Sequence, residues 1–122
     1  MKALIVDDSR FIRQHLRQLL QSMGIACEEA SDGCEALEIL HRTTNFDFMF
    51  VDVNMPRMDG LECVRQLRDA RLNPRMKVMM VTTEADNSFI SRALECGADE
   101  FLMKPFTPQS LREKLRMLGL AA

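Results

Sequence analysis

The sequence predicts an α/β fold, a doubly wound (βα)5 three-layer sandwich built on a parallel sheet of five strands. Short, uninterrupted apolar runs alternate along the chain with longer segments whose apolar residues recur at helical spacing. Regular alternation of strand and helix is typical of a parallel sheet covered by helices on both faces. The connections between these segments are short, and 122 residues suit one domain spanning 1–122.

The predicted strands are residues 3–6, 25–30, 48–51, 78–81 and 101–103. Most of these runs are apolar throughout, as expected for strands buried on both faces. The second run differs because it carries Glu28 and Glu29, and charges favour an edge position. The strand order 2-1-3-4-5, common among doubly wound sheets, places this run at an edge.

The predicted helices follow from apolar stripes that would face the sheet. The first stripe spans residues 12–23 and ends at Gly24. The later stripes are Ala36, Leu37 and Leu40; Leu61, Val64 and Leu67; Ile90, Ala93 and Leu94; and Leu111, Leu115 and Leu118.

Composition excludes several classes of protein. Hydrophobic residues are 47% and charged residues 28% of the chain, as in ordinary globular domains. The net charge of −2 gives no general attraction to nucleic acid or anionic lipid. No apolar run approaches the roughly 18 residues of a membrane span, and no signal-peptide pattern is present. We therefore expect a cytoplasmic protein with no nucleic-acid or membrane partner.

The four cysteines are Cys27, Cys34, Cys63 and Cys96. Their spacing matches no zinc-binding pattern. We expect them to be reduced and to act as small hydrophobic residues.

The candidate site consists of polar residues that follow four predicted strands. Asp7 and Asp8 follow the first strand, Asp52 the third, Thr82 ends the fourth, and Lys104 follows the fifth. Parallel strands end at one edge of the sheet, where α/β proteins bind ligands. Neighbouring strands are about 4.8 Å apart, so Asp52 would lie one strand from the acidic pair and one from Thr82. Lys104 would reach back from roughly 10 Å away.

These residue types predict phosphoryl transfer. Three carboxylates and one lysine leave a local charge of −2, and hard oxygen ligands favour Mg²⁺. A cation, a lysine and a hydroxyl around a carboxylate suit phosphoryl chemistry. Asp52 would be the nucleophile, which forms an aspartyl phosphate. Lys104 would stabilise the charge of the transferring group, and Thr82 would donate a hydrogen bond to it.

Five motifs together resemble the receiver domain of two-component response regulators, a CheY-like, flavodoxin-like family. The motifs are residues 4–9 (LIVDDS), 51–56 (VDVNMP), 58–61 (MDGL), 81–83 (VTT) and 97–106 (GADEFLMKPF). They run from the first strand to the start of the last helix, so the resemblance covers almost the whole chain. Each motif alone is weak, whereas all five in this order are specific.

The resemblance implies roles for individual residues. Asp52 accepts a phosphoryl group from a sensor histidine kinase. Asp8 and Asp52 bind Mg²⁺ directly, together with the main-chain carbonyl of Asn54, and Asp7 acts mainly through a bound water. Lys104 contacts the phosphoryl group. The protein is then a signalling protein that catalyses only its own phosphorylation and dephosphorylation.

The resemblance also implies a switch. Thr82 moves toward the phosphoryl group and Phe101 rotates inward, which changes the surface of the fourth helix, fifth strand and fifth helix. That surface binds a downstream effector protein. Phe101 replaces a tyrosine common in motility regulators, so no phenol hydroxyl is present. The Lys104–Pro105 bond resembles one that is cis in the family. A monomer is expected when unphosphorylated, with a phosphorylation-dependent dimer as the alternative.

Residues 114–120 resemble the end of stand-alone chemotaxis-type regulators, which favours that subgroup. A phosphorelay intermediate and a receiver domain excised from a larger regulator, such as a transcription factor, remain alternatives. A degenerate receiver is a further one. A haloacid-dehalogenase-type phosphatase needs an acid two residues after its nucleophile, and Asn54 cannot transfer a proton. A flavodoxin-like flavin module conflicts with the acidic edge.

Arg10, Arg13 and Arg17 share one face of the first predicted helix. A solvated surface is the favoured interpretation. The alternative is a kinase-docking strip beside the acidic site, with Phe11 as its apolar anchor.

Overall fold

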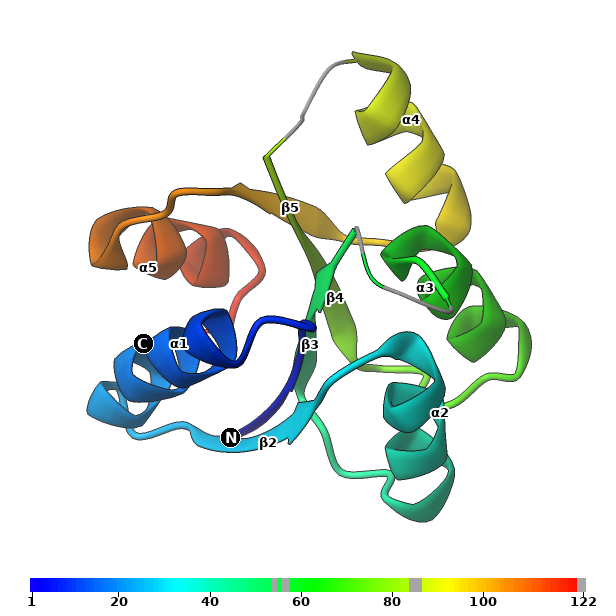
Figure 1. The fold of residues 1–122 in the computed structure, drawn as a ribbon, viewed down its shortest axis with the longest axis horizontal. Helices are drawn as coiled ribbons and strands as arrows, with labels where there is room; N and C mark the ends of the chain where they lie inside the picture. Colours follow the sequence, from blue (N-terminus) through cyan, green and yellow to red (C-terminus); the bar gives the residue numbers. More distant parts are fainter. Residues whose placement is uncertain (54, 56–57, 84–86, 121–122) are drawn as a thin grey trace.

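The computed structural model of the chain describes residues 1–53, 55, 58–83 and 87–120. A five-stranded parallel sheet crosses the molecule with the order β2-β1-β3-β4-β5 (Figure 1). The strands are β1 (Lys2–Val6), β2 (Ala26–Ala30), β3 (Phe48–Asp52), β4 (Lys77–Thr82) and β5 (Glu100–Met103). The predicted order is confirmed, with the charged strand β2 at one edge.

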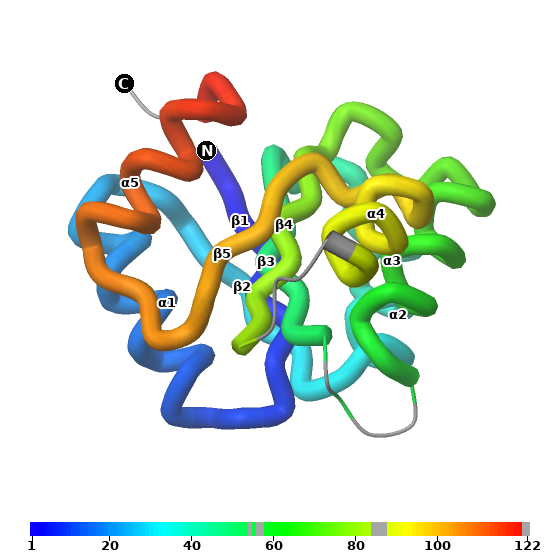
Figure 2. Tube along the Cα trace, turned by 90° about the horizontal axis from the view of Figure 1, so that it is seen from above, coloured from blue at the N-terminus to red at the C-terminus, as the bar shows by residue number. Residues whose placement is uncertain are grey.

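Helices cover both faces of the sheet. They are α1 (Arg10–Ser22), α2 (Gly33–Arg42), α3 (Gly60–Asp69), α4 (Asn87–Cys96) and α5 (Pro108–Met117). Helices α1 and α5 lie on one face, and α2, α3 and α4 lie on the other (Figures 1 and 2). The three-layer, doubly wound architecture is therefore confirmed. No helix among the described residues is both long and apolar enough to span a membrane.

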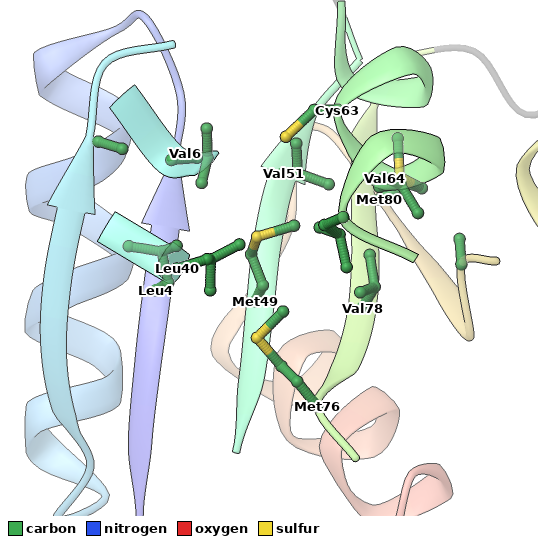
Figure 3. Close-up of a cluster of buried hydrophobic side chains, with 14 of the residues drawn as sticks. Leu4, Val6, Leu40, Met49, Val51, Cys63, Val64, Met76, Val78 and Met80 are labelled. Carbon is green, nitrogen blue, oxygen red and sulfur yellow. The ribbon is translucent and has the colours of Figure 1, made fainter. Parts of the chain in front are cut away.

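Two buried clusters fill the space between the layers. The first lies between the sheet and helices α2 to α4, where Met49, Met76 and Met80 pack with aliphatic side chains (Figure 3). The second lies beneath α1 and α5, where Phe48 and Phe50 meet edge to face with ring centroids 5.3 Å apart. Unbranched methionines suit the first cluster because they fill irregular gaps between strands and helices.

One predicted core position is wrong. Leu94 belongs to the apolar stripe of α4, yet this residue is 57% exposed. Phe89 is buried in its place and packs with Ala93 in the first cluster. The two choices differ by a rotation of the helix about its axis, and the larger ring buries more apolar area.

The edge strand β2 carries its charges in ion pairs. Glu28 pairs with Lys2 at 2.7 Å, and Glu29 pairs with Arg13 at 3.1 Å and with Arg17 at 2.7 Å. Arg13 and Arg17 therefore brace α1 against β2, and the solvated-face interpretation is wrong for both. Arg10 is exposed, as that interpretation expects.

The cysteines behave as predicted. All four are free thiols. Cys63 is fully buried between α3 and α2 and is part of the first cluster.

Candidate functional site

Three carboxylates meet at the carboxyl end of the sheet. Asp7 follows β1, Asp52 is the last residue of β3, and Asp8 stands beside them. One oxygen of each lies within 4.8 Å of the others. Asp7 and Asp52 are 2% and 6% exposed, whereas Asp8 is exposed to solvent. This combination leaves one open side for a cation or a phosphoryl group. The predicted convergence of these three carboxylates is thus observed.

Lys104 joins this cluster from the far side of β4. Its Nζ lies 3.1 Å from Asp7 Oδ2 and 3.3 Å from Asp52 Oδ1. Its main-chain N–H donates to the carbonyl of Thr82 at 2.7 Å, which fixes the start of the side chain. The Lys104–Pro105 bond is cis. Burial alone would lower the pKa of Lys104, but Asp7 and then Asp52 outweigh it, and the pKa is raised. The lysine is therefore a fixed positive charge beside Asp52.

Asp7 is held by several neighbours. Its Oδ1 accepts from the Ser9 main-chain N–H at 2.8 Å, and its Oδ2 faces Lys104. The Arg13 guanidinium donates to the Asp7 main-chain oxygen at 2.5 Å. Ser9 is also the N-cap of α1, accepting from the N–H of Ile12. The start of α1 and the position of Asp7 are thus fixed together.

Gly60 sets the backbone beneath Asp52. Its N–H donates to the Val53 carbonyl at 2.8 Å. A Cβ on Gly60 would lie 2.2 Å from the main-chain oxygen of Asp52, so only glycine allows α3 to begin this close to β3. Asp59 caps the same helix. Gly60 is part of a family motif, but its contact with Asp52 was not predicted.

The proposed switch residues lie on adjoining strands. Thr82 ends β4 and is 2% exposed, and Phe101 lies on β5 and is partly exposed. Thr82 is opposite Met103 in the register, and Phe101 is opposite Met80. The two are therefore two register positions apart on neighbouring strands. Asn54, whose carbonyl is an expected Mg²⁺ ligand, lies outside the described residues.

An aromatic stack borders the site. The rings of Phe11 and His15 stack at 6.3 Å, and those of His15 and Phe106 at 5.4 Å. These rings and Lys104 line a hollow of about 410 Å³. Phe11 is 74% exposed. Phe11 and His15 are four residues apart on α1, so their contact could be expected from the sequence. The contact of Phe106 with His15 could not, because it depends on how the chain after β5 packs against α1.

Comparison with known proteins identifies the family. The sequence model of the response regulator receiver domain family matches residues 3–116 of this chain. This chain belongs to the response regulator receiver domain family. It is a receiver domain of the CheY-like kind, and so a signalling protein.

Two chemotaxis proteins are similar in sequence to this chain along nearly their whole length. The receiver domain is 42% identical to the chemotaxis protein CheY of Pseudomonas aeruginosa, over 97% of this chain and 95% of that protein. It is 36% identical to chemotaxis protein CheY1 of Helicobacter pylori, over 97% of this chain and 96% of that protein.

Solved structures share the fold. Chemotaxis protein CheY4 of Vibrio cholerae superposes with a TM-score of 0.89 at 38% identity, covering 95% of this chain and 96% of that one. A probable response regulator/GGDEF domain protein matches with a TM-score of 0.88 at 30% identity. That match covers 98% of this chain and 50% of the larger protein. The same receiver architecture therefore occurs alone and beside a second domain.

Family membership gives the carboxylate cluster a general meaning. Receiver domains bind Mg²⁺ at an acidic pocket, and Asp7, Asp8 and Asp52 form such a cluster here. CheY-like receivers take phosphate from histidine kinases and bind effectors.

Proposed function

We propose that this receiver domain, one unit spanning residues 1–122, accepts a phosphoryl group on Asp52 from a sensor histidine kinase. The observation that carries this is the position of Lys104, whose Nζ lies 3.3 Å from Asp52 Oδ1. A buried carboxylate with a fixed cation and an exposed acidic neighbour has the parts of a phosphoryl-acceptor site.

In the transfer, an Asp52 oxygen attacks phosphorus and forms the new P–O bond. The P–N bond of the donor's phosphohistidine breaks, and its electron pair stays on the imidazole, which leaves and takes up a proton. Lys104 stabilises negative charge on the phosphoryl oxygens. Thr82, which ends the strand next to Asp52, donates its hydroxyl to a phosphoryl oxygen once the group is attached.

Mg²⁺ would be held by Asp8 and Asp52 directly and by Asp7 through water, with the carbonyl of Asn54. The donor set fits because it contains only hard oxygen atoms, and because Asp8 is exposed. When bound, Mg²⁺ neutralises charge on the phosphoryl oxygens.

The output is a change of surface. Movement of Thr82 toward the phosphoryl group allows the Phe101 ring to turn inward. That change alters the surface of α4, β5 and α5, which binds an effector protein of the chemotaxis or motility kind. The unphosphorylated protein is a cytoplasmic monomer in this proposal, and neither nucleic acid nor membrane is a direct partner. A tenfold gain in partner affinity requires only about 1.4 kcal/mol of coupling.

The test is phosphorylation by acetyl phosphate with Mg²⁺, measured by intact mass. The wild-type protein should gain one phosphoryl group, and the gain should disappear in Asp52→Asn and without Mg²⁺. Asp69→Asn, an exposed acid at the end of α3, is the matched control and should behave as wild type. Folded wild-type protein that gains no mass and does not bind beryllium fluoride would be a degenerate receiver, and the proposal would be wrong.

A further inference from the structure

Glu100, Phe101 and Lys114 form a closed group of contacts between β5 and α5. Glu100 Oε1 accepts from the main-chain N–H of Phe101 at 3.0 Å. The same oxygen lies 3.1 Å from Lys114 Nζ. That ammonium lies 4.5 Å from the centroid of the Phe101 ring. One lysine thus contacts both the carboxylate that precedes the ring and the ring itself.

The side chains of this group are partly buried, so water screens their interactions only in part. The side chains of Lys114 and Glu100 are 23% and 15% exposed. A cation within about 6 Å of a ring centroid is attracted to the ring face, and the carboxylate holds the cation in place. Strand β5 is an edge of the sheet, where main-chain N–H groups lack a neighbouring strand. The Glu100 carboxylate accepts a hydrogen bond from one of them, the N–H of Phe101.

We propose that Lys114 is a positioning residue that holds the Phe101 ring in its partly exposed position, and that Glu100 holds Lys114 for this purpose. The inference rests on the proposed role of Phe101 as the switch ring. It adds a restraint on that ring which acts before any phosphoryl group is present.

An inward turn of the ring takes its face away from the Lys114 ammonium. The contact is therefore made in one position of the ring and lost in the other, and such a difference shifts the equilibrium between them. A cation–π contact at a partly exposed site changes such an equilibrium by about two- to five-fold. Loss of the lysine charge should increase the ratio of inward to outward ring positions by that factor.

The test follows the ring directly in unphosphorylated protein. The chain has seven phenylalanines. Labelling with 4-fluorophenylalanine gives a fluorine spectrum in which the Phe101 signal is the one missing from Phe101→Leu. The solvent isotope shift of that signal, between H₂O and D₂O, reports how exposed the ring is.

Lys114→Met keeps the length of the side chain and removes its charge, so the Phe101 signal should report a more buried ring. Glu100→Gln should shift it in the same direction, because Lys114 loses its anchor. Lys114→Arg keeps a cation and should restore the wild-type signal. Lys77→Met, at an exposed lysine that begins β4, is the matched control and should leave it unchanged.

The proposal is overturned if folded Lys114→Met leaves the Phe101 isotope shift unchanged. It is also overturned if Lys77→Met changes that shift as much as Lys114→Met does. Because the measurement uses no phosphate, it succeeds or fails independently of Asp52 chemistry. Addition of beryllium fluoride then tests the switch itself. A ring that responds to Lys114→Met but not to beryllium fluoride supports the restraint and contradicts the proposed switch role of Phe101.

Discussion

The first residue of α3, Gly60, lies so close to Asp52 that a Cβ there would be 2.2 Å from the Asp52 main-chain oxygen. The obstacle is backbone rather than the end of a flexible side chain. Any larger residue must therefore displace either the start of α3 or the end of β3, and the end of β3 carries the proposed phosphoacceptor.

Gly60→Ala should lower both stability and phosphorylation. Overpacking of this kind costs about 1–3 kcal/mol, and displacement of Asp52 should slow phosphorylation by acetyl phosphate. Urea unfolding and intact mass measure the two effects. Gly24→Ala is the control, because Gly24 has a φ of +79° and open space around it. That variant should lose about 1–2 kcal/mol but keep its phosphorylation rate. A wild-type rate in Gly60→Ala would contradict the prediction.

The Lys104 ion pairs should be lost at alkaline pH. The pKa of Lys104 is raised in the folded protein because its carboxylate partners outweigh burial. A raised pKa stabilises the fold fully below the unfolded value of about 10.5. This contribution is lost as pH rises through the raised value.

Lys104→Met should therefore be less stable than wild type near pH 8, by about 1–3 kcal/mol, because Asp7 and Asp52 lose a hydrogen-bond partner. The difference should shrink above pH ~11. Urea midpoints of both proteins across this range measure it. Lys77→Met, which removes an exposed lysine, controls for loss of charge alone. A constant difference between wild type and Lys104→Met from pH 8 to beyond ~11 would refute the pairing.

Mg²⁺ should stabilise the receiver domain against unfolding. A ligand at a hundred times its Kd adds about 2.7 kcal/mol. Asp8→Asn relieves repulsion within the carboxylate cluster, so without Mg²⁺ this variant should be slightly more stable than wild type. It should nevertheless lose most of the gain from Mg²⁺. Melting temperatures in EDTA and in excess Mg²⁺ distinguish the two effects, with Asp69→Asn as control. A full Mg²⁺ response in Asp8→Asn would remove Asp8 from the ligand set.

Cys63 should resist alkylation in the folded protein. Burial raises its pKa to about 12, so at pH 8 roughly one thiol in ten thousand is ionised. Iodoacetamide should modify the partly exposed Cys34 and Cys96 first. Cys63 should react only after unfolding in urea, which peptide mass mapping detects. Modification of Cys63 in native protein at the rate of Cys34 would show that α2 and α3 separate readily.

The positions of the site residues at strand ends could be predicted from the sequence, because apolar runs mark the strands and show where each strand ends. Asp7, Asp52, Thr82 and Lys104 each follow or end an apolar run, and parallel strands bring such positions to one edge. The charges of β2 likewise indicated an edge strand. Both predictions depend on periodicity and topology, and neither requires the exact path of a loop.

Other features depend on side chains meeting across the fold. The partners of Arg13 could not be inferred from the sequence. Its position on the helix allows the side chain either to point into solvent or to pair with Glu29. The exposure of Leu94 depends on a rotation of α4 that favours Phe89, and both residues are apolar. The approach of Gly60 to Asp52 depends on where α3 begins. In each case two arrangements satisfy the local pattern, and only packing chooses between them.

The hydrogen bond between Lys104 and Asp7 joins residues 97 positions apart. As the protein is synthesised, Asp7 and Asp52 leave the ribosome long before the lysine that completes their site. A nascent chain that ends before β5 lacks this cation, so it should not become charged with phosphate at the wild-type rate. In this view the site becomes competent for phosphorylation only after β5 and Lys104 have been synthesised.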